Sequence, residues 1–212
     1  VVDGGAAGHF GAVLDLGAGH LGAAVVAGDV TGRWTAGSAG SIAIRGSLLG
    51  GSIELSSAAV GRGTALGKLV VAGDVTGAAV RTRGSIGRVQ VGSLHASRLL
   101  AGVSPAVADH PASRADLVEP RAAIAALTVT GTGGRTDRFV SDSRVAAGSL
   151  GVINLLNADF GAGGGIGLWA DGAAARPVGR VVHLDRLTGD RWAWPVRRGL
   201  FAGPDDLIHL LV

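Results

Sequence analysis

An aromatic and basic cluster near the end of the chain has the residue types that bind sugars or nucleic acids. Its sequence is Arg191-Trp192-Ala193-Trp194-Pro195-Val196-Arg197-Arg198. On a strand, Trp192 and Trp194 project to the same side, where their rings can stack on a sugar while arginines reach a carboxylate or phosphate. Large rings also cover the end of a hydrophobic core. We favour this cap role, and the candidate ligand-binding residues are Trp192, Trp194, Arg191, Arg197 and Arg198.

Two aspartates, Asp29 and Asp74, occupy the same place in a recurring phrase, Gly-Asp-Val-Thr-Gly. Hard cations bind clustered oxygens, so the two side chains are candidate Ca²⁺ ligands if they stack near each other. Aspartate after glycine is also typical of a turn in which the carboxylate accepts a hydrogen bond from a nearby backbone amide. We favour the turn role and expect no cofactor, with Ca²⁺ at Asp29 and Asp74 as the alternative.

A third motif, at residues 13–22, is a strand-like run that leads into Gly-x-Gly-x-x-Gly. It resembles the first motif of Rossmann-type methyltransferases, in which glycines let the backbone approach a cofactor at a helix N-terminus. That fold requires a helix next, whereas Gly28 and Gly32 interrupt the segment that follows. A methyltransferase is therefore the second alternative function.

Other catalytic constellations are missing from the sequence. There is no cysteine, and Glu54 and Glu119 are the only glutamates. A glycoside hydrolase needs two carboxylates at a defined separation, and no Asp-Asp or Asp-x-Asp pair falls within a repeat strand. The Gly-x-Ser-x-Gly motif of many serine hydrolases is also absent. These observations predict that the protein is not an enzyme.

All of these residues lie in or beside an internal repeat. Leu21–Gly32 recurs 45 residues later as Leu66–Gly77, and looser copies begin at Ala39 and Ile86. The second glycines of the four copies fall at positions 28, 46, 73 and 92. This spacing indicates a coil of about 18 to 20 residues, with an insertion of about eight around residues 57–64.

Apolar residues alternate between the glycines of each copy, as in Ile42 and Ile44, which is typical of a short strand with one buried face. A second strand is expected after each turn. Its apolar residues are Trp34, Ile53, Leu55, Val80, Leu99 and Leu100. Stacked coils would pair each strand in parallel with the next and close a continuous core. The sequence therefore predicts an all-β parallel β-solenoid, or β-helix, right-handed by the general crossover preference.

The repeat divides the chain into four segments. Coils are expected in residues 1–103 and 122–184. Residues 104–121 contain three prolines and mixed charges, which indicates a loop or excursion. Residues 185–212 depart from the repeat and are expected to form an irregular C-terminal cap that protects the last strand edge.

The repeated phrase also carries a family resemblance. The pattern x-Gly-x-β-x-β-x-Gly-Asp-Val-Thr-Gly, with Phe139–Ala147 before Leu150-Gly151, resembles the long glycine-rich repeat proteins predicted to be secreted by planctomycete-like bacteria. The resemblance spans about residues 10–185. It implies a secreted or cell-surface β-solenoid and specifies no chemistry.

Composition narrows the classes further. The 19 basic and 16 acidic residues leave a net charge of +3, too little to predict nucleic-acid binding. No apolar run is long enough for a membrane-spanning helix. We therefore expect a non-catalytic structural spacer, adhesion or matrix element whose partners are cell-surface glycans or other copies of itself. The alternative is a carbohydrate-binding or polysaccharide-cleaving β-helix that uses exposed arginines with Trp192 and Trp194.

Overall fold

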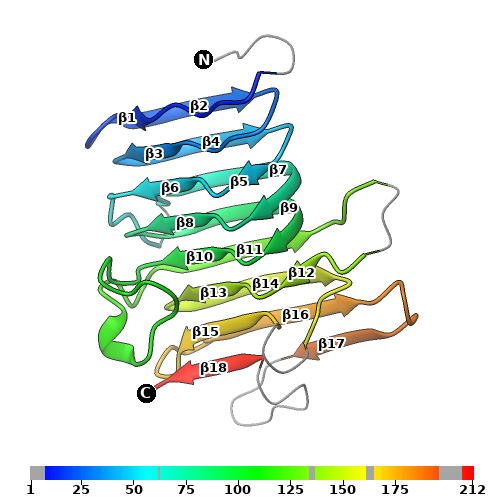
Figure 1. Cartoon of the computed structure of the whole chain (residues 1–212). Coiled ribbons are helices and arrows are strands. Elements are labelled where there is room, and N and C mark those ends of the chain that lie inside the picture. Colours follow the sequence, from blue (N-terminus) through cyan, green and yellow to red (C-terminus); the bar gives the residue numbers. More distant parts are fainter. Residues whose placement is uncertain (1–7, 62, 134–136, 161–164, 196–206) are drawn as a thin grey trace.

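The computed structural model describes residues 8–61, 63–133, 137–160, 165–195 and 207–212. Its fold is all-β, as the alternation of apolar residues predicts, and consists of two stacked sheets (Figure 1). The eight-stranded sheet contains, in spatial order, β1 (Leu14–Asp15), β3 (Arg33–Ala36), β6 (Ser52–Leu55), β8 (Ala79–Thr82), β10 (Arg98–Ala101), β13 (Arg144–Ala147), β15 (Gly167–Asp171) and β18 (Ile208–Leu211).

The ten-stranded sheet begins at the same end of the molecule. Its main path runs through β2 (His20–Val26), β4 (Ser38–Ile44), β7 (Leu66–Thr76), β9 (Ile86–His95), β11 (Ala123–Val129), β14 (Ser149–Leu156), β16 (Val178–Leu184) and β17 (Arg191–Pro195). Two short strands, β5 (Leu48–Leu49) and β12 (Val140–Ser141), pair beside this path with β7 and β9.

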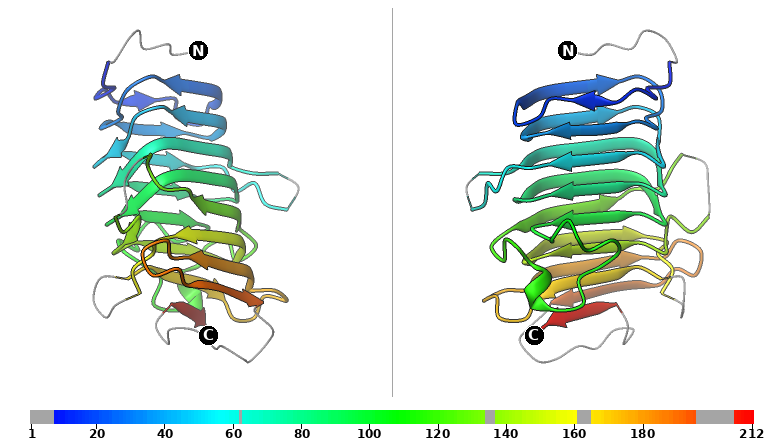
Figure 2. Two further views of the ribbon diagram at one scale, coloured as in Figure 1. Left: turned by 90° about the vertical axis from the view of Figure 1, so that its right-hand side faces the viewer. Right: turned by 60° about the vertical axis from the view of Figure 1, so that its left-hand side comes forward.

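The chain alternates between the two sheets, so that β3 leads to β4, β6 to β7 and β8 to β9. Neighbouring strands pair in parallel throughout both sheets, except that β17 runs antiparallel to β16. The register step from Ala39 to Leu66 is longer than the step from Leu66 to Ile86, because extra residues lie between β6 and β7. This is the predicted insertion, and Figure 2 shows its flanks extending away from the stack.

A third, shorter column of parallel pairs lies beside the ten-stranded sheet. Isolated bridges join Phe10 to Val30 and Val30 to Leu48, and the column continues through Val75 and Leu94 to Val140. Each of these coils therefore contacts the next on three sides. The repeat predicted at least two strands in a coil, and this column supplies the third contact.

The core lies between the sheets, where side chains from successive coils stack in rows. One row from the ten-stranded sheet and one from the eight-stranded sheet face each other, and all their members are buried. These rows are Ile42, Leu69, Val89, Leu127, Ile153 and Val181, and Trp34, Ile53, Val80, Leu99, Val145 and Leu168. The predicted alternation of buried and outward residues is confirmed along these strands.

Glycine recurs at one aligned position near the start of the long strands, because successive coils approach each other closely there. A Cβ atom added to Gly67 would lie 2.4 Å from the carbonyl oxygen of Gly40, and one added to Gly87 would lie 2.4 Å from that of Gly67. Real Cβ atoms do not approach a carbonyl oxygen so closely. At Gly22, in the first coil, a Cβ would meet nothing within 4 Å.

The aspartates of the Gly-Asp-Val-Thr-Gly phrase belong to a ladder of hydrogen bonds between coils. The Ser47 amide donates to Asp29 Oδ1 over 2.7 Å, and the Asp74 amide donates to Ser47 Oγ over 3.0 Å. Ser93 Oγ then donates to Asp74 Oδ1 over 2.7 Å. The polar side chain after the second glycine therefore joins one coil to the next, and the amide bound by Asp29 lies in the next coil instead of its own turn.

We expect Asp74→Ala to lower the free energy of unfolding by about 1–3 kcal/mol, because the buried Ser93 hydroxyl loses its acceptor. Asp74→Asn retains an oxygen at the same place and should lose clearly less. Urea denaturation of the two variants measures the difference. Equal losses for alanine and asparagine would show that the ladder bond contributes nothing.

At the C-terminal end, the structure departs from regular stacking. Strand β17 turns back along β16, with Trp194 opposite Val181 in the register, so the last long strand ends against an antiparallel partner. Strand β18 instead continues the parallel order of the eight-stranded sheet. Within the described part of the chain, no helix has the length and apolar character needed to cross a membrane.

Candidate binding groove on the eight-stranded sheet

Outward-facing residues of the eight-stranded sheet line up in rows, because parallel strands in register place equivalent side chains one coil apart. Thr35 pairs with Glu54, and Glu54 pairs with Arg81, on β3, β6 and β8. Neighbouring members of this row are separated by the strand spacing of about 4.8 Å. A hydroxyl, a carboxylate and a guanidinium therefore follow one another along the stack.

The excursion, residues 104–121, forms a wall beside this row. It contains one 3₁₀ turn, η1 (Arg114–Asp116), and no strand, and Figure 2 shows it (green) lying across the strands. The pairs β8–β10–β13 and β9–β11 continue without interruption, so the excursion lies on one continuous stack.

Arginines on the sheet hold the excursion in place. Arg81 donates to the carbonyl oxygen of Ser104 over 2.7 Å and to that of Val107 over 2.5 Å. Arg98 binds the carboxylate of Asp109 over 2.8 Å. From the excursion itself, Arg114 reaches the buried carboxylate of Asp171 over 3.0 Å.

A second, small hydrophobic cluster lies under the excursion and is separate from the main core. Its buried members are Leu100, Val103, Leu117, Ala146, Trp169 and Leu211. The Trp169 ring is stacked between two histidines, with centroid distances of 4.5 Å to His110 and 4.6 Å to His209. His110 belongs to the excursion, so this stacking ties the excursion to β15 and β18.

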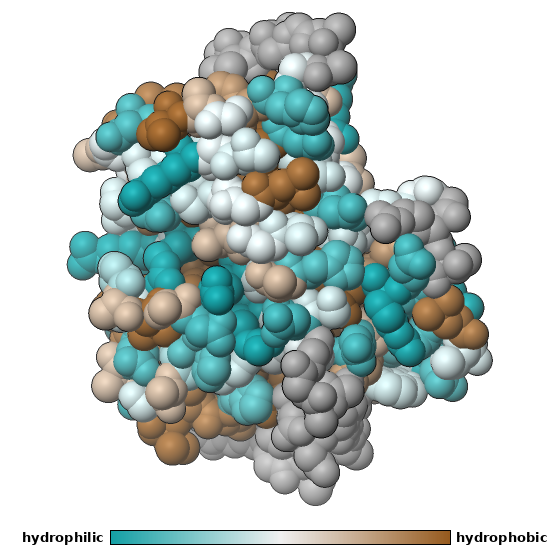
Figure 3. Space-filling view, viewed as in Figure 1, coloured by the Kyte–Doolittle hydropathy of each residue, from teal (hydrophilic) through white to brown (hydrophobic). Residues whose placement is uncertain are grey.

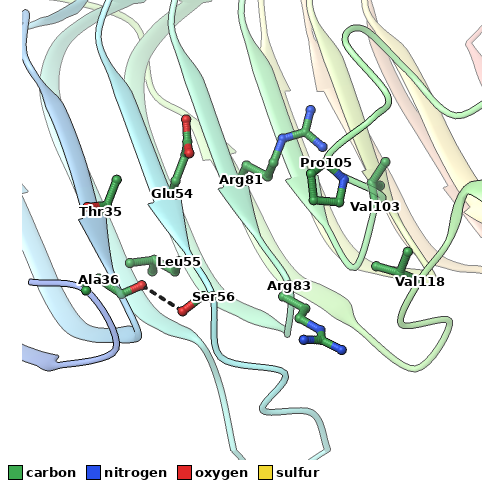
Figure 4. A pocket seen from close by; sticks show the side chains of 11 residues that line it. Thr35, Ala36, Glu54, Leu55, Ser56, Arg81, Arg83, Val103, Pro105 and Val118 are labelled. Carbon is green, nitrogen blue, oxygen red and sulfur yellow. Dashed lines mark hydrogen bonds between the residues drawn. The ribbon is translucent and has the colours of Figure 1, made fainter. Parts of the chain in front are cut away.

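Between the excursion and strands β3, β6 and β8 there is a groove of about 480 Å³ (Figure 4). It extends from the first coil to the excursion. Its lining consists of Gly17, Thr35, Ala36, Glu54, Leu55, Ser56, Arg81, Arg83, Val103, Pro105 and Val118. Polar groups from successive coils therefore share one cavity with the apolar side chains of the excursion. Figure 3 shows hydrophobic residues on the visible face as small separate areas.

Positive charge exceeds negative charge around the groove. Glu54 is paired with Arg33 over 2.8 Å, whereas Arg81 is bound by two neutral carbonyl groups. Burial lowers the pKa of Arg81 from its very high ordinary value, the Glu54 carboxylate opposes that shift, and the guanidinium remains charged. Arg83 is exposed and makes no ion pair within the described part of the chain. The Thr35 hydroxyl donates to Asp15 and, with the Gly17 amide, lowers the pKa of that carboxyl.

The aromatic and basic cluster predicted from the sequence lies elsewhere, at the end of the ten-stranded sheet. Trp192 on β17 packs against Phe160 and His183, with centroid distances of 5.3 Å and 4.9 Å, and is partly buried. Arg191 is exposed at the start of β17. The side chain of Trp194 and the residues Arg197 and Arg198 lie outside the described part of the chain. Both the cap role and ligand binding by this cluster stay predictions.

The two candidate calcium ligands are not adjacent, because Ser47 stands between Asp29 and Asp74 in the ladder. Asp29 also contacts His9, whose Nδ1 lies 3.0 Å from Oδ2. Across the described ranges, no three His, Asp or Glu side chains gather in a way that could hold a metal ion. Calcium binding at Asp29 and Asp74 stays a prediction.

Residues 13–22 do not form a nucleotide-binding turn. Leu14 and Asp15 make up β1, and the segment from His20 to Val26 forms strand β2 where a Rossmann fold requires a helix. The all-β fold is incompatible with the methyltransferase alternative. No family model, curated protein or solved structure matches this chain.

His183 is a buried titratable group close to the cap. Its Nε2 accepts a hydrogen bond from the Ala158 amide over 3.1 Å, so the neutral ring carries its proton on Nδ1, which has no hydrogen-bond partner among the described residues. Burial lowers the pKa of His183, and Asp185 opposes that shift in part. The ring must lose the Ala158 hydrogen bond to become charged.

This environment predicts a stability that depends on pH. Because the pKa of His183 is lower in the folded than in the unfolded chain, its neutral form is favoured on folding, and stability falls as pH drops below the ordinary histidine pKa of about 6.5. The pKa of Asp185 is also lowered, but that carboxyl affects stability only in the more acidic range of ordinary aspartates. The urea concentration at the unfolding midpoint of the native protein should decrease as the pH is lowered from about 7.5 to about 5. His183→Gln should show a shallower fall, and parallel curves for the two proteins would contradict this assignment.

Proposed function

We propose that the chain is a right-handed parallel β-solenoid and that it serves outside the cell as a non-catalytic structural, adhesion or matrix element. One observation carries the proposal: parallel pairing continues from β2 to β16 in one sheet and from β1 to β18 in the other. The insertion and the excursion leave this pairing intact. A stack of this kind resists bending, because every coil is bonded to its neighbours along its length.

The extracellular location follows from the resemblance to secreted glycine-rich repeat proteins. Protease treatment of intact source cells, followed by detection with an antibody against this chain, should show a protein that is accessible at the surface or released into the medium. A protein protected until the cells are broken would overturn the location. Small-angle scattering should show a particle of one fixed shape.

Absence of catalysis is part of the proposal. Incubation with neutral and acidic polysaccharides, followed by mass spectrometry of soluble products, should show no shortened chains. Reproducible cleavage that disappears in a groove variant would replace the structural assignment with an enzymatic one. The partners we expect are cell-surface glycans or further copies of this chain, and neither nucleic acid nor a membrane.

A second candidate function is that of a carbohydrate-binding β-helix, and the groove favours it. The cavity lies on an outward sheet face, and its hydroxyl, carboxylate and guanidinium groups, on Thr35, Glu54 and Arg81, follow one another at the coil spacing. Binding and a structural role are compatible, because an adhesion element needs both a rigid body and a ligand site.

A further inference from the structure

The groove has the form of a site for a linear ligand. Its lining comes from four successive turns of the stack, at Gly17, Thr35, Glu54 and Arg81, so it extends over three coil steps of about 4.8 Å each, or about 14 Å. Pro105 of the excursion and Val103, just before it, lie at one end. A chain that lies along the stack axis with units repeating near the coil spacing, as pyranose units do, would place one unit against each coil.

The charge of the groove favours an anionic ligand. Glu54 already has a cationic partner in Arg33, so its charge is compensated. Arg81 is next to Glu54 in the row but donates its hydrogen bonds to the neutral carbonyl groups of Ser104 and Val107, so one carboxylate lies between two guanidinium groups. These bonds fix the guanidinium in place without a direct ion pair among the described residues, and exposed Arg83, directly after the end of β8, adds a second positive charge. Guanidinium groups bind carboxylates with charge-assisted hydrogen bonds.

The remaining lining matches a saccharide better than a nucleic acid. Leu55, Val103, Pro105 and Val118 provide aliphatic contacts for the C–H faces of a sugar ring. The hydroxyl oxygens of Thr35 and Ser56, whose protons go to Asp15 and to the Ala36 carbonyl group, can accept hydrogen bonds from sugar hydroxyls. The lining contains no aromatic side chain. Single-stranded nucleic acids are usually held by stacking of their bases on aromatic rings, and the groove cannot supply that contact.

We propose that this groove binds a short stretch of a carboxylated polysaccharide, with one uronate carboxylate at Arg81, a second at Arg83, and sugar hydroxyls at Glu54 and Thr35. The inference deepens the second candidate function and rests on it. It is independent of the proposed extracellular structural role, which is tested by location and solution shape without a ligand.

Isothermal titration calorimetry of the whole chain with a short oligogalacturonate tests the proposal, with the fully methyl-esterified oligomer as the neutral probe. The native protein should bind the acid form and should bind the ester at least about tenfold more weakly. Arg83→Gln should weaken binding of the acid form about tenfold, which corresponds to about 1.4 kcal/mol. Because Arg83 is exposed, this variant should fold normally.

Two matched variants remove the same charge elsewhere. Arg88→Gln alters the outer face of the other sheet, and Arg176→Gln alters a separate cavity of about 630 Å³ on the far side of the excursion. Both should bind like the native protein. Equal weakening in all three variants would mean general charge attraction, and weakening in Arg176→Gln alone would place the ligand in the other cavity. Each of these two results would overturn the proposal. So would the absence of binding of the acid form, or equal binding of the acid and the ester.

Discussion

Replacing Trp169 with alanine is expected to lower the free energy of unfolding by about 3–5 kcal/mol, the usual cost of removing a large buried aromatic side chain. The ring is 7% exposed and is stacked between His110 and His209, and the Arg144 guanidinium carbon lies 6.0 Å from its centroid. The substitution removes these contacts together with packing in the small cluster under the excursion.

The same substitution should free the excursion from the sheet. Trypsin should then cleave the folded variant at Arg114 and Arg121, which are exposed but held in an ordered segment in the native protein. Because the excursion forms one wall of the groove, binding of the acidic oligosaccharide should weaken as well.

Trp192→Ala is the matched control, since it removes the same side chain from the end of the other sheet. It should cost less stability, because Trp192 is only partly buried, and should leave cleavage at Arg114 and Arg121 unchanged. Equal trypsin patterns for the two variants would show that Trp169 does not hold the excursion.

Adding one methyl group should affect stability very differently at two glycines that occupy the same aligned position of the long strands. We expect Gly67→Ala to lower the free energy of unfolding by about 2–3 kcal/mol, as overpacking in a tight core does. The added Cβ would lie 2.4 Å from the Gly40 carbonyl oxygen, so β4 and β7 must separate locally. In β11 the aligned position is occupied by Ala125, which lies opposite Gly87 of β9. The stack therefore accommodates an alanine at this position in one coil, and we expect the Gly67→Ala variant to fold.

Gly22→Ala is the internal control for this prediction. Gly22 occupies the same position in β2, where no neighbouring atom lies within 4 Å of the added Cβ. The free energy of unfolding of this variant should stay within about 0.5 kcal/mol of the native value, as for most surface substitutions. Thermal or urea unfolding of the two variants measures the difference. Equal losses would mean that the aligned glycines do not reflect close contact between coils.

The coil spacing could be predicted from the sequence because it has a local signal. The second glycines of the four copies lie in contact with one another, since a Cβ on Gly46 would meet Gly28 and a Cβ on Gly73 would meet Gly46. Apolar alternation likewise identified the buried faces of β4 and β9. Both signals result from repeated contacts between equivalent positions, so each copy of the repeat reinforces them.

The groove could not be predicted in the same way, because it depends on contacts between segments that follow no repeat. Docking of residues 104–121 requires His110 to meet Trp169, and Arg81 to meet two carbonyl groups that no side-chain pattern marks. Trp192 and Trp194 are close together in the sequence, which marks them as a candidate site, whereas Trp169 has no aromatic neighbour there. Comparing outward positions of the second strands would have placed Thr35, Glu54 and Arg81 in one row.

If the coils form one continuous parallel stack, distances along one outward row must grow by one strand spacing for each coil. Ala23, Ser41, Lys68, Arg88, Ala126, Val152 and Arg180 occupy successive coils of the ten-stranded sheet. The chain has no cysteine, so spin labels can be attached at introduced pairs such as Ala23→Cys with Ala126→Cys, and Ala23→Cys with Arg180→Cys.

Pulsed electron paramagnetic resonance should give backbone separations that grow by about 4.8 Å for each coil, or about 19 Å for the first pair and about 29 Å for the second, after allowance for the label arms. Two further pairs separate the number of coils from the number of residues. Ala23→Cys with Arg88→Cys and Arg88→Cys with Arg180→Cys each span three coils, although the second pair encloses more residues, so both should give the same backbone separation of about 14 Å. Separations that scale with sequence distance, or broad distributions without a regular step, would contradict the stack.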